Sequence, residues 1–273
     1  MTGDAGEGTA GGALSGTSGL AGPGDGAAPL RAVEGMSGAA GSADGGFGVG
    51  ARGGAEVPPW LAGLAESAAR MTVPLPLRPP PGGGRPSAVL ILFGDGPDGP
   101  DLLLVQRSLS LRRHAGQPAF PGGSIDESDS GPVAAALREA AEEAQVDPSG
   151  VQVLTVMPEL YITRSGFSVT PVLAWWRRPA PVAPGDLTET AAVARVPLAE
   201  LADPANRATL RYPSGHAGPA FRVGSMLVWG FTAMVVDRLL AMGGWERPWD
   251  AEPPQEMPPE VLRAATGGLD RSP

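Results

Sequence analysis

The sequence predicts an α/β fold in which helices cover a sheet, and two observations support this class. Apolar runs of strand length occur at residues 88–93, 102–106, 151–157 and 168–176. Between and after them, two stretches have helical character: one begins at Pro132 and the other covers residues 227–242. This order of strands and helices along the chain favours an α/β/α sandwich.

The 41 glycines and 31 prolines of this 273-residue chain are unevenly distributed. Residues 1–56 contain 19 of the glycines and almost no bulky apolar residues, so we expect a disordered glycine-rich tail there. A short helix and a Pro/Gly linker should occupy residues 57–85. Residues 86–243 are expected to form the main domain, followed at 244–273 by a proline-rich acidic tail with little fixed structure.

Composition also limits the function. The formal charge of −9 argues against general nucleic-acid binding, which needs clustered positive charge. No apolar run approaches the length of a membrane span, and the first residues lack the layout of a signal peptide. With no cysteine, disulfides and thiolate metal sites are excluded. We therefore expect a cytoplasmic protein without a membrane partner; the composition does not predict an oligomeric state.

The first elements can be placed by spacing and by chain breakers. Residues 58–71 have apolar side chains at helical spacing, and residues 74–86 contain a proline triplet and a glycine triplet typical of an extended linker. Two apolar runs, at 88–93 and 102–106, flank a turn at 95–101, which predicts a hairpin.

After the hairpin, residues 108–116 form a loop with a small basic group: Arg112, Arg113 and His114. Taken alone, these side chains are most simply explained as a solvated loop. Close to a phosphate-binding site they would instead suit phosphate contacts, because arginine donates in a bidentate fork.

The second half of the domain continues the alternation. Strands are expected at residues 151–157 and 168–176, separated by a turn at 163–166, with Trp175 and Trp176 serving packing. A turn-rich connection at 179–185 precedes a strand at 188–196 and a short helix at 197–201. A last strand at 221–223 and the helix at 227–242 complete the prediction.

The stretch from Phe120 to Val146 carries the chemistry. Gly122 and Gly123 allow a sharp turn and close approach of the backbone to a ligand. An acidic loop with Asp126, Glu127 and Asp129 follows, and Pro132 suits the first turn of a helix that Asp129 or Ser130 could cap.

On that helix Glu139, Glu142 and Glu143 occupy positions i, i+3 and i+4, so three carboxylates share one face. Like charges at this spacing destabilise a helix unless they are solvated or share a cation. A solvated face is the common case. The adjacent Arg138, the Gly-Gly pair and the acidic loop favour instead a site for Mg²⁺ or Mn²⁺, which prefer oxygen ligands.

This stretch resembles the Nudix box, G-x5-E-x7-R-E-U-x-E-E-x-G-U. Gly123 opens the box, Arg138-Glu139 is the R-E pair and Glu142-Glu143 is the E-E pair. The sequence departs from the pattern at Asp129, in place of the mid-box glutamate, in a loop that is one residue longer, and at Gln145, in place of the late glycine.

A second resemblance precedes the box: residues 102–123 look like the signature of the coenzyme A pyrophosphatase branch of the Nudix superfamily. The agreeing residues are Leu103, Leu104, Arg107, Ser108, Leu111, Arg112, His114, Gly116, Phe120, Pro121, Gly122 and Gly123.

The resemblance implies a Nudix-type α/β/α sandwich with a mixed sheet and hydrolysis of the diphosphate of coenzyme A or acyl-coenzyme A. It implies that Mg²⁺ or Mn²⁺ is held by the Gly123 carbonyl, Glu139, Glu142 and Glu143, with Arg138 orienting the carboxylates. The general base would be Glu142, Glu143 or Glu189, and substrate phosphates would be bound by Arg107, Arg112 and His114. We expect Arg112 in particular to contact the 3′-phosphate.

Two alternatives stay open. The same fold could serve a pyrophosphatase of ADP-ribose or dinucleotides, for which the sequence offers only the general box. A non-catalytic nucleotide-binding module with a decayed box is also conceivable, because Asp129 and Gln145 depart from the pattern.

Overall fold

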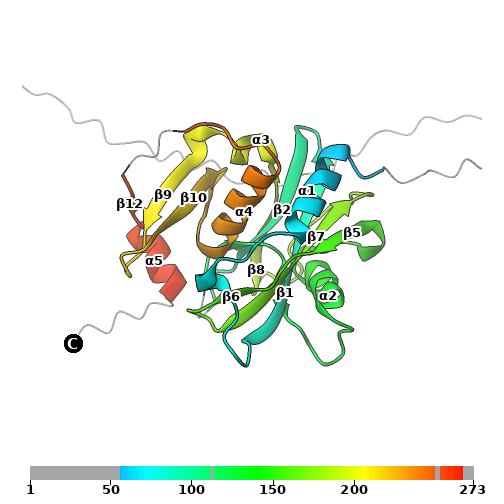
Figure 1. The fold of residues 1–273 in the computed structure, drawn as a ribbon, viewed down its shortest axis with the longest axis horizontal. Helices are drawn as coiled ribbons and strands as arrows, with labels where there is room; N and C mark the ends of the chain where they lie inside the picture. Colours follow the sequence, from blue (N-terminus) through cyan, green and yellow to red (C-terminus); the bar gives the residue numbers. More distant parts are fainter. Residues whose placement is uncertain (1–55, 112–113, 250–252, 267–273) are drawn as a thin grey trace, which may run out of the picture.

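Figure 1 shows the computed structural model of the chain, which describes residues 56–111, 114–249 and 253–266. The predicted glycine-rich tail at 1–56 falls almost entirely outside these ranges. The described part is built around an eight-stranded sheet in which β3, β2, β1, β7 and β5 are neighbours. Their bounds are Pro118–Ala119, Gly99–Arg107, Arg85–Gly96, Phe167–Trp176 and Val151–Val156.

Three further strands pair with members of this row. β4 (Gly122–Ser124) pairs with β1, β6 (Leu160–Ile162) with β7 and β8 (Thr190–Pro197) with β2. The β1–β7 pair is parallel and the other pairs are antiparallel, so the sheet is mixed, as expected. The predicted hairpin is confirmed: β1 and β2 are antiparallel and turn between Gly96 and Gly99.

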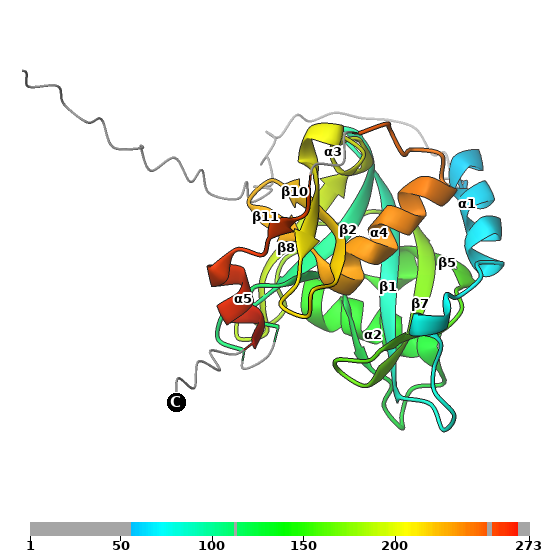
Figure 2. The same ribbon diagram turned by 60° about the vertical axis from the view of Figure 1, so that its left-hand side comes forward.

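Helices cover both faces of the sheet (Figures 1 and 2). On one face lies α2 (Pro132–Ala144), whose buried Ala135, Ala136, Ala140 and Ala144 allow close packing on the strands. On the other face lie α1 (Pro59–Ala69) and α4 (Gly230–Met242). The α/β/α sandwich predicted from the sequence is therefore the architecture of the protein.

Strand alternation divides the core into two layers. Trp175 and Trp176 follow each other on β7, and both are buried, so the prediction that they serve packing is confirmed. Trp175 joins the apolar cluster under α1 and α4, whereas Trp176 joins the cluster under α2. Neighbouring residues of a strand point to opposite faces, which explains the division.

The region after residue 206 differs from the prediction. A second sheet contains β11 (Met226–Val228), β10 (Ala217–Val223), β9 (Arg207–Arg211) and β12 (Gln255–Glu256) in that order. The helix expected from residue 227 begins only at Gly230, because Trp229 is extended and Gly230 has a φ of 67°. Residues 227 and 228 are strand instead.

The segment after Gly243 was expected to have little fixed structure, and this was wrong for its described residues. Trp245 packs edge-on against Trp60, with ring centroids 5.2 Å apart. Farther on, β12 pairs in parallel with β9, and α5 (Pro259–Thr266) follows. These contacts could not be predicted from the sequence, because a single tryptophan and a two-residue strand leave no periodic pattern in a proline-rich segment.

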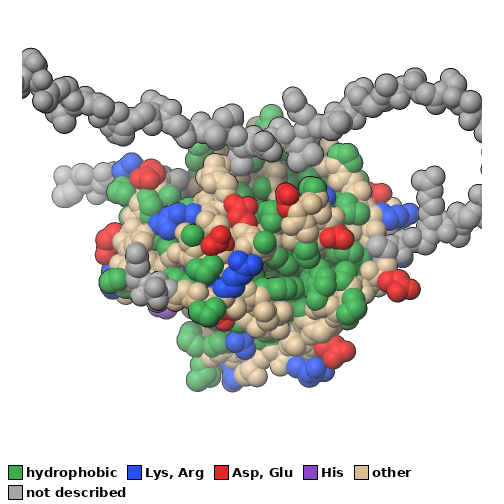
Figure 3. Space-filling model, turned by 90° about the horizontal axis from the view of Figure 1, so that it is seen from above, with side chains coloured by type: hydrophobic (Ala, Val, Ile, Leu, Met, Phe, Trp, Pro, Cys, Tyr) green, Lys and Arg blue, Asp and Glu red, His purple; other side chains and the backbone are tan. Residues whose placement is uncertain are grey.

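Short elements connect the layers: α3 (Leu198–Leu201) is the predicted short helix, and single 3₁₀ turns occur at η1 (Leu75–Leu77), η2 (Pro148–Gly150) and η3 (Pro204–Asn206). No helix in the described ranges has the length and apolar character needed to cross a membrane. Figure 3 shows one face of the molecule, where hydrophobic side chains gather in the middle and positive and negative side chains are interspersed around them.

Candidate functional site

The loop before α2 is organised by Arg138 rather than by a helix cap. We expected Asp129 or Ser130 to cap the helix, but its N-cap is Gly131 and no side chain bonds there. Asp129 instead accepts hydrogen bonds from Arg138 Nε (3.2 Å) and Nη2 (3.0 Å). The guanidinium offers Asp129 two charge-assisted hydrogen bonds, so its carboxylate faces Arg138 rather than the helix end.

Arg138 also contacts the glutamates of its own helix. Its Nη1 donates to Glu139 Oε1 (3.0 Å) and Glu142 Oε2 (2.9 Å), and its Nη2 donates to the Ser124 carbonyl (3.2 Å). Hydrogen bonding to Asp129 is the main reason that the pKa of Arg138 is raised and that of Asp129 is lowered. One guanidinium thus hydrogen-bonds three carboxylates and the loop backbone, and its Nη2 lies 3.5 Å from a fourth carboxylate, that of Asp126.

Glu143 occupies a different environment. Its side chain is only 8% exposed, and Oε2 accepts a hydrogen bond from the Gly122 backbone N–H (3.0 Å). Burial raises the pKa of its carboxyl to about 7, although the Gly122 bond and Arg107 act in the opposite direction. Glu139 and Glu189 lie close enough to raise the pKa of Glu143 further by repulsion. The structure therefore brings Glu189, from the end of the 177–189 loop, to the carboxylates of α2.

Gly123 lets Glu139 lie directly against the loop backbone. A Cβ at Gly123 would be 2.6 Å from Glu139 Cδ, so any other residue there would push the Glu139 carboxylate aside. Gly122 is confined more strictly, since a Cβ there would be 2.7 Å from the backbone Cα of Val89. Both glycines pair with β1 as part of β4, and this pairing fixes the loop beneath α2.

Several of these groups suit a divalent cation. The donors are all oxygens, Gly123 forms a close cradle for Glu139, and burial raises the pKa of both Glu139 and Glu143. Buried carboxylates with raised pKa values would be stabilised in their charged form by a hard cation. Glu139 and Glu142 are, however, bonded to Arg138. Within the described ranges no group of three or more His, Cys, Asp or Glu side chains is arranged to hold a metal as it stands.

The predicted substrate-binding residues differ in position. The Arg107 side chain points toward the carboxylates, with its Nη1 3.6 Å from Glu143 Oε1. Its Nε is buried without a hydrogen-bond partner among the described residues. His114 is exposed, has a φ of 57° and hydrogen-bonds through Nδ1 to Gln117 Oε1 (2.8 Å). Arg112 and Arg113 lie outside the described residues.

Two residues of the site were not foreseen. Gln117 contacts His114, as just described. Gly185 donates its N–H to the Glu143 carbonyl (3.1 Å), and a Cβ there would be 2.9 Å from the carbonyl carbon of Glu142. The 177–189 loop is therefore seated on the end of α2. The Pro-Gly pair at 184–185 signalled a turn, but no pattern in the sequence indicated which helix it would meet.

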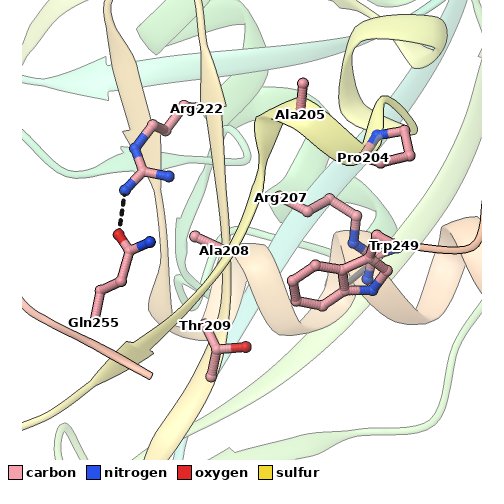
Figure 4. Close-up of a pocket in the computed structure, with 8 residues that line it drawn as sticks. All are labelled: Pro204, Ala205, Arg207, Ala208, Thr209, Arg222, Trp249 and Gln255. Carbon is pink, nitrogen blue, oxygen red and sulfur yellow. Dashed lines mark hydrogen bonds between the residues drawn. The ribbon is translucent and has the colours of Figure 1, made fainter. Parts of the chain in front are cut away.

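A cavity of about 230 Å³ lies elsewhere, on the second sheet (Figure 4). The residues that line it include Arg207, whose guanidinium stacks on the Trp249 ring, and Arg222, which donates a hydrogen bond to Gln255 (2.6 Å). The Arg207 guanidinium is bonded to Asp237 of α4 and lies 3.5 Å from Glu246. The cavity contains none of the predicted site residues, and its buried arginine joins the second sheet to α4.

Comparison with known proteins agrees with the geometry. Residues 84–214 match the family model described as NUDIX domain. Over 122 residues the chain is 45% identical to proteins named "Uncharacterized Nudix hydrolase NudL" from Escherichia coli K12 and from Shigella boydii serotype 4. Each match covers 42% of this chain and 59% of the relative, so it spans less than two thirds of the relatives' length.

Among solved structures, a Nudix hydrolase from M. smegmatis, RenU, aligns with a TM-score of 0.43 and 22% identity, covering 61% of this chain and 89% of that one. The family match includes β1, β4 and α2, the elements that carry Gly123, Arg138 and the three glutamates. Over residues 84–214 this chain is therefore similar to the NUDIX domain.

Proposed function

We propose that this protein is a metal-dependent hydrolase that cleaves the diphosphate of coenzyme A or an acyl-coenzyme A. The products are adenosine 3′,5′-bisphosphate and 4′-phosphopantetheine or its acyl form. The observation that carries the proposal is the group of α2 carboxylates: Glu139 and Glu143 lie against the Gly122-Gly123 backbone, and Glu142 joins Glu139 through Arg138. The relatives named Nudix hydrolases support the reaction class, and the signature at residues 102–123 supports the substrate.

In this proposal, Glu139, Glu142, Glu143 and the Gly123 carbonyl hold Mg²⁺ or Mn²⁺. The bound cation neutralises charge on the nonbridging phosphate oxygens and lowers the pKa of a water molecule. Because Arg138 binds Glu139 and Glu142 in the present arrangement, binding requires these side chains to adjust. Arg138 then keeps the acidic loop and the helix together through Asp129.

The chain's own groups supply the proton transfer. Hydrolysis adds one water: its oxygen bonds to phosphorus, the bond to the bridging oxygen breaks, and the attacking water gives up a proton. Glu143 is one candidate for the base; burial raises the pKa of its carboxyl to about 7 when no cation is bound. Glu142 and Glu189 are the other candidates, and Glu189 is the more exposed of the two neighbours of Glu143 that raise its pKa.

If the substrate is coenzyme A, its phosphates are bound by residues in and next to the basic loop at 108–116. Arg107, Arg112 and His114 belong to one segment, and the Arg107 side chain reaches Glu143. A fork of arginine donors suits the 3′-phosphate that distinguishes coenzyme A from ADP-ribose and NADH. We assign that contact to Arg112.

A substrate panel tests the proposal. The full chain is incubated with coenzyme A, ADP-ribose or NADH in the presence of Mg²⁺ or Mn²⁺, and products are identified by mass spectrometry. We expect adenosine 3′,5′-bisphosphate and 4′-phosphopantetheine from coenzyme A, with the highest kcat/KM of the panel. Preferred hydrolysis of ADP-ribose or NADH would favour the dinucleotide alternative, and no hydrolysis of any member would favour a nucleotide-binding module.

The 3′-phosphate contact has its own test. Arg112→Ala should raise KM for coenzyme A by about ten- to a hundredfold, because charge-assisted hydrogen bonds are lost. KM for 3′-dephospho-coenzyme A should change little. Equal losses on both substrates would assign Arg112 to the diphosphate or to the loop itself.

A further inference from the structure

Residues 114–117 form a tight turn at the end of the basic loop. The Gln117 N–H donates to the His114 carbonyl (3.2 Å), and Gly116 in the third position has a φ of 68°, as turns of this kind often require. Leu109 covers this turn, since a Cβ at Gly116 would be 2.8 Å from Leu109 Cδ2. Residues at the first and last positions of such a turn have side chains within reach of each other.

His114 is held in an unusual state for a loop residue. Its backbone is left-handed, with a φ of 57°, a conformation that residues other than glycine adopt uncommonly. Its exposed ring contacts Gln117 through Nδ1 at 2.8 Å. Among the residues that the structure describes, none hydrogen-bonds to the other ring nitrogen, Nε2. The strain and the fixed ring together point to a side chain held for a ligand.

Gln117 is itself tied to the site by its backbone. Its carbonyl accepts from the Arg107 N–H (3.1 Å), and the Gly116 N–H donates to the Arg107 carbonyl (3.0 Å). The Arg107 side chain lies against Glu143. The turn that carries His114 is therefore bonded to the residue that contacts the α2 carboxylates.

The Gln117 side chain is wedged between His114 and the start of α4. Its Nε2 is 3.2 Å from the place of a Cβ on Gly230, which has a φ of 67°. The Gly230 N–H is bonded to the Tyr212 hydroxyl (3.0 Å), and Thr232 Oγ1 donates to the carbonyl of Pro118, next to Gln117. Because Gly230 has no side chain, the Gln117 amide can lie beside the first residue of α4 while its Oε1 contacts His114.

We propose that Gln117 is a positioning residue for His114, a role that rests on the proposed function. With Oε1 as the acceptor, the His114 proton resides on Nδ1, and Nε2 is presented to solvent and substrate. A protonated ring keeps the same contact and adds an Nε2–H donor for a substrate phosphate. Gln117 thus fixes the orientation of the ring in both states without contacting the substrate itself.

The chain has only two histidines, His114 and His216, which makes the ring state directly observable. Long-range ¹H–¹⁵N spectra of the full chain at pH 8.5 separate a protonated from an unprotonated ring nitrogen, and His216→Asn assigns the signals. We expect the His114 proton on Nδ1 in the wild type and in Gln117→Glu, which keeps an acceptor. In Gln117→Leu the proton should shift toward Nε2. A wild-type proton on Nε2 would overturn the proposal.

Kinetics provide the second readout. Gln117→Leu should raise KM for coenzyme A by about three- to tenfold, the value of one hydrogen bond, and leave kcat within about twofold. In a His114→Ala background the same change should add nothing. A further rise of KM in the double variant would show that Gln117 acts independently of His114 and would contradict the proposal. Absence of wild-type hydrolysis on the whole panel would contradict the proposed function, whereas the spectra would still decide the role of Gln117.

Discussion

Two neighbouring glutamates of α2 differ sharply in environment. The Glu142 side chain is 58% exposed and bonded to Arg138, whereas that of Glu143 is 8% exposed beneath the Gly122 N–H. One step along a helix turns a side chain by about 100°, so adjacent residues can lie on the solvent and on the sheet. Helical spacing therefore sets the difference in their chemistry.

The raised pKa of Glu143 predicts how stability depends on pH when no metal is bound. The folded-state pKa of Glu143, about 7, lies above the ordinary glutamate value of 4.5, so the stabilisation from the protonated form is fully present below about pH 4.5. It is lost as pH rises through 7, at a total cost of about 3 kcal/mol. In urea denaturation with a chelator, Glu143→Gln should be more stable than the wild type at pH 8, and this advantage should vanish near pH 4.5.

The matched control for this experiment is Glu142→Gln, whose side chain is mostly exposed. It should show a much smaller gain at pH 8. Equal gains in the two variants would mean that general repulsion on α2, rather than burial of Glu143, sets the pH dependence.

At the scale of residues, spacing predicted the acidic face of α2 but not its partners. Positions i, i+3 and i+4 placed Glu139, Glu142 and Glu143 together because helix geometry is fixed. The contact between Arg138 and Asp129 could not be read from spacing, because it depends on the path of a loop. The same limit applies to Gln117, whose role depends on a turn and on Gly230 of a distant helix.

Among the elements, the end of α2 shows how a departure from the family pattern is accommodated. Gln145 takes the left-handed position at a φ of 55°, and the Val146 N–H reaches back to the Ala140 carbonyl (3.2 Å), as in a Schellman motif. The Gln145 side chain donates through Nε2 to the Pro184 carbonyl (3.1 Å), which belongs to the 177–189 loop that contacts the end of the helix. A non-glycine residue at this position carries backbone strain.

Comparing two substitutions at Gln145 isolates this strain. Both Gln145→Gly and Gln145→Ala lose the bond to Pro184, but only glycine relieves the left-handed backbone. We expect the glycine variant to be more stable than the alanine variant by about 1 kcal/mol in urea denaturation. If alanine were as stable as glycine, the helix end would have rearranged to avoid the left-handed state.

Elements with strong periodicity were predicted well, and elements defined by contacts were not. Strands β1, β2, β5, β7 and β8 and helices α1 and α2 follow from apolar runs and helical spacing. β9 and β12 pair only because distant segments meet, and the first residues of the expected last helix join a sheet because Gly230 breaks the helical path. Such tertiary effects leave little local trace.

For the whole molecule, the two terminal segments should differ in importance. Residues 1–56 offer almost no apolar face, so removing them should leave the melting temperature within a few degrees and turnover nearly unchanged. Ending the chain at Gly243 removes Trp245, which packs on Trp60 and lies 6.2 Å from Phe93 between ring centroids. We expect that truncation to cost about 2–4 kcal/mol. Thermal unfolding of both truncated chains checks this, and the reverse order of stability would contradict it.

The central proposal is that the α2 carboxylates hold the metal that hydrolysis requires, and turnover of Glu142→Gln and Glu143→Gln on coenzyme A tests it most directly. With saturating Mg²⁺ or Mn²⁺, each variant should lose about a hundredfold or more in kcat and keep its cooperative thermal unfolding. Glu66→Gln on α1 changes an exposed glutamate that pairs with Arg70 at the surface, and it should keep wild-type turnover. Wild-type rates in either α2 variant would remove this site from the account.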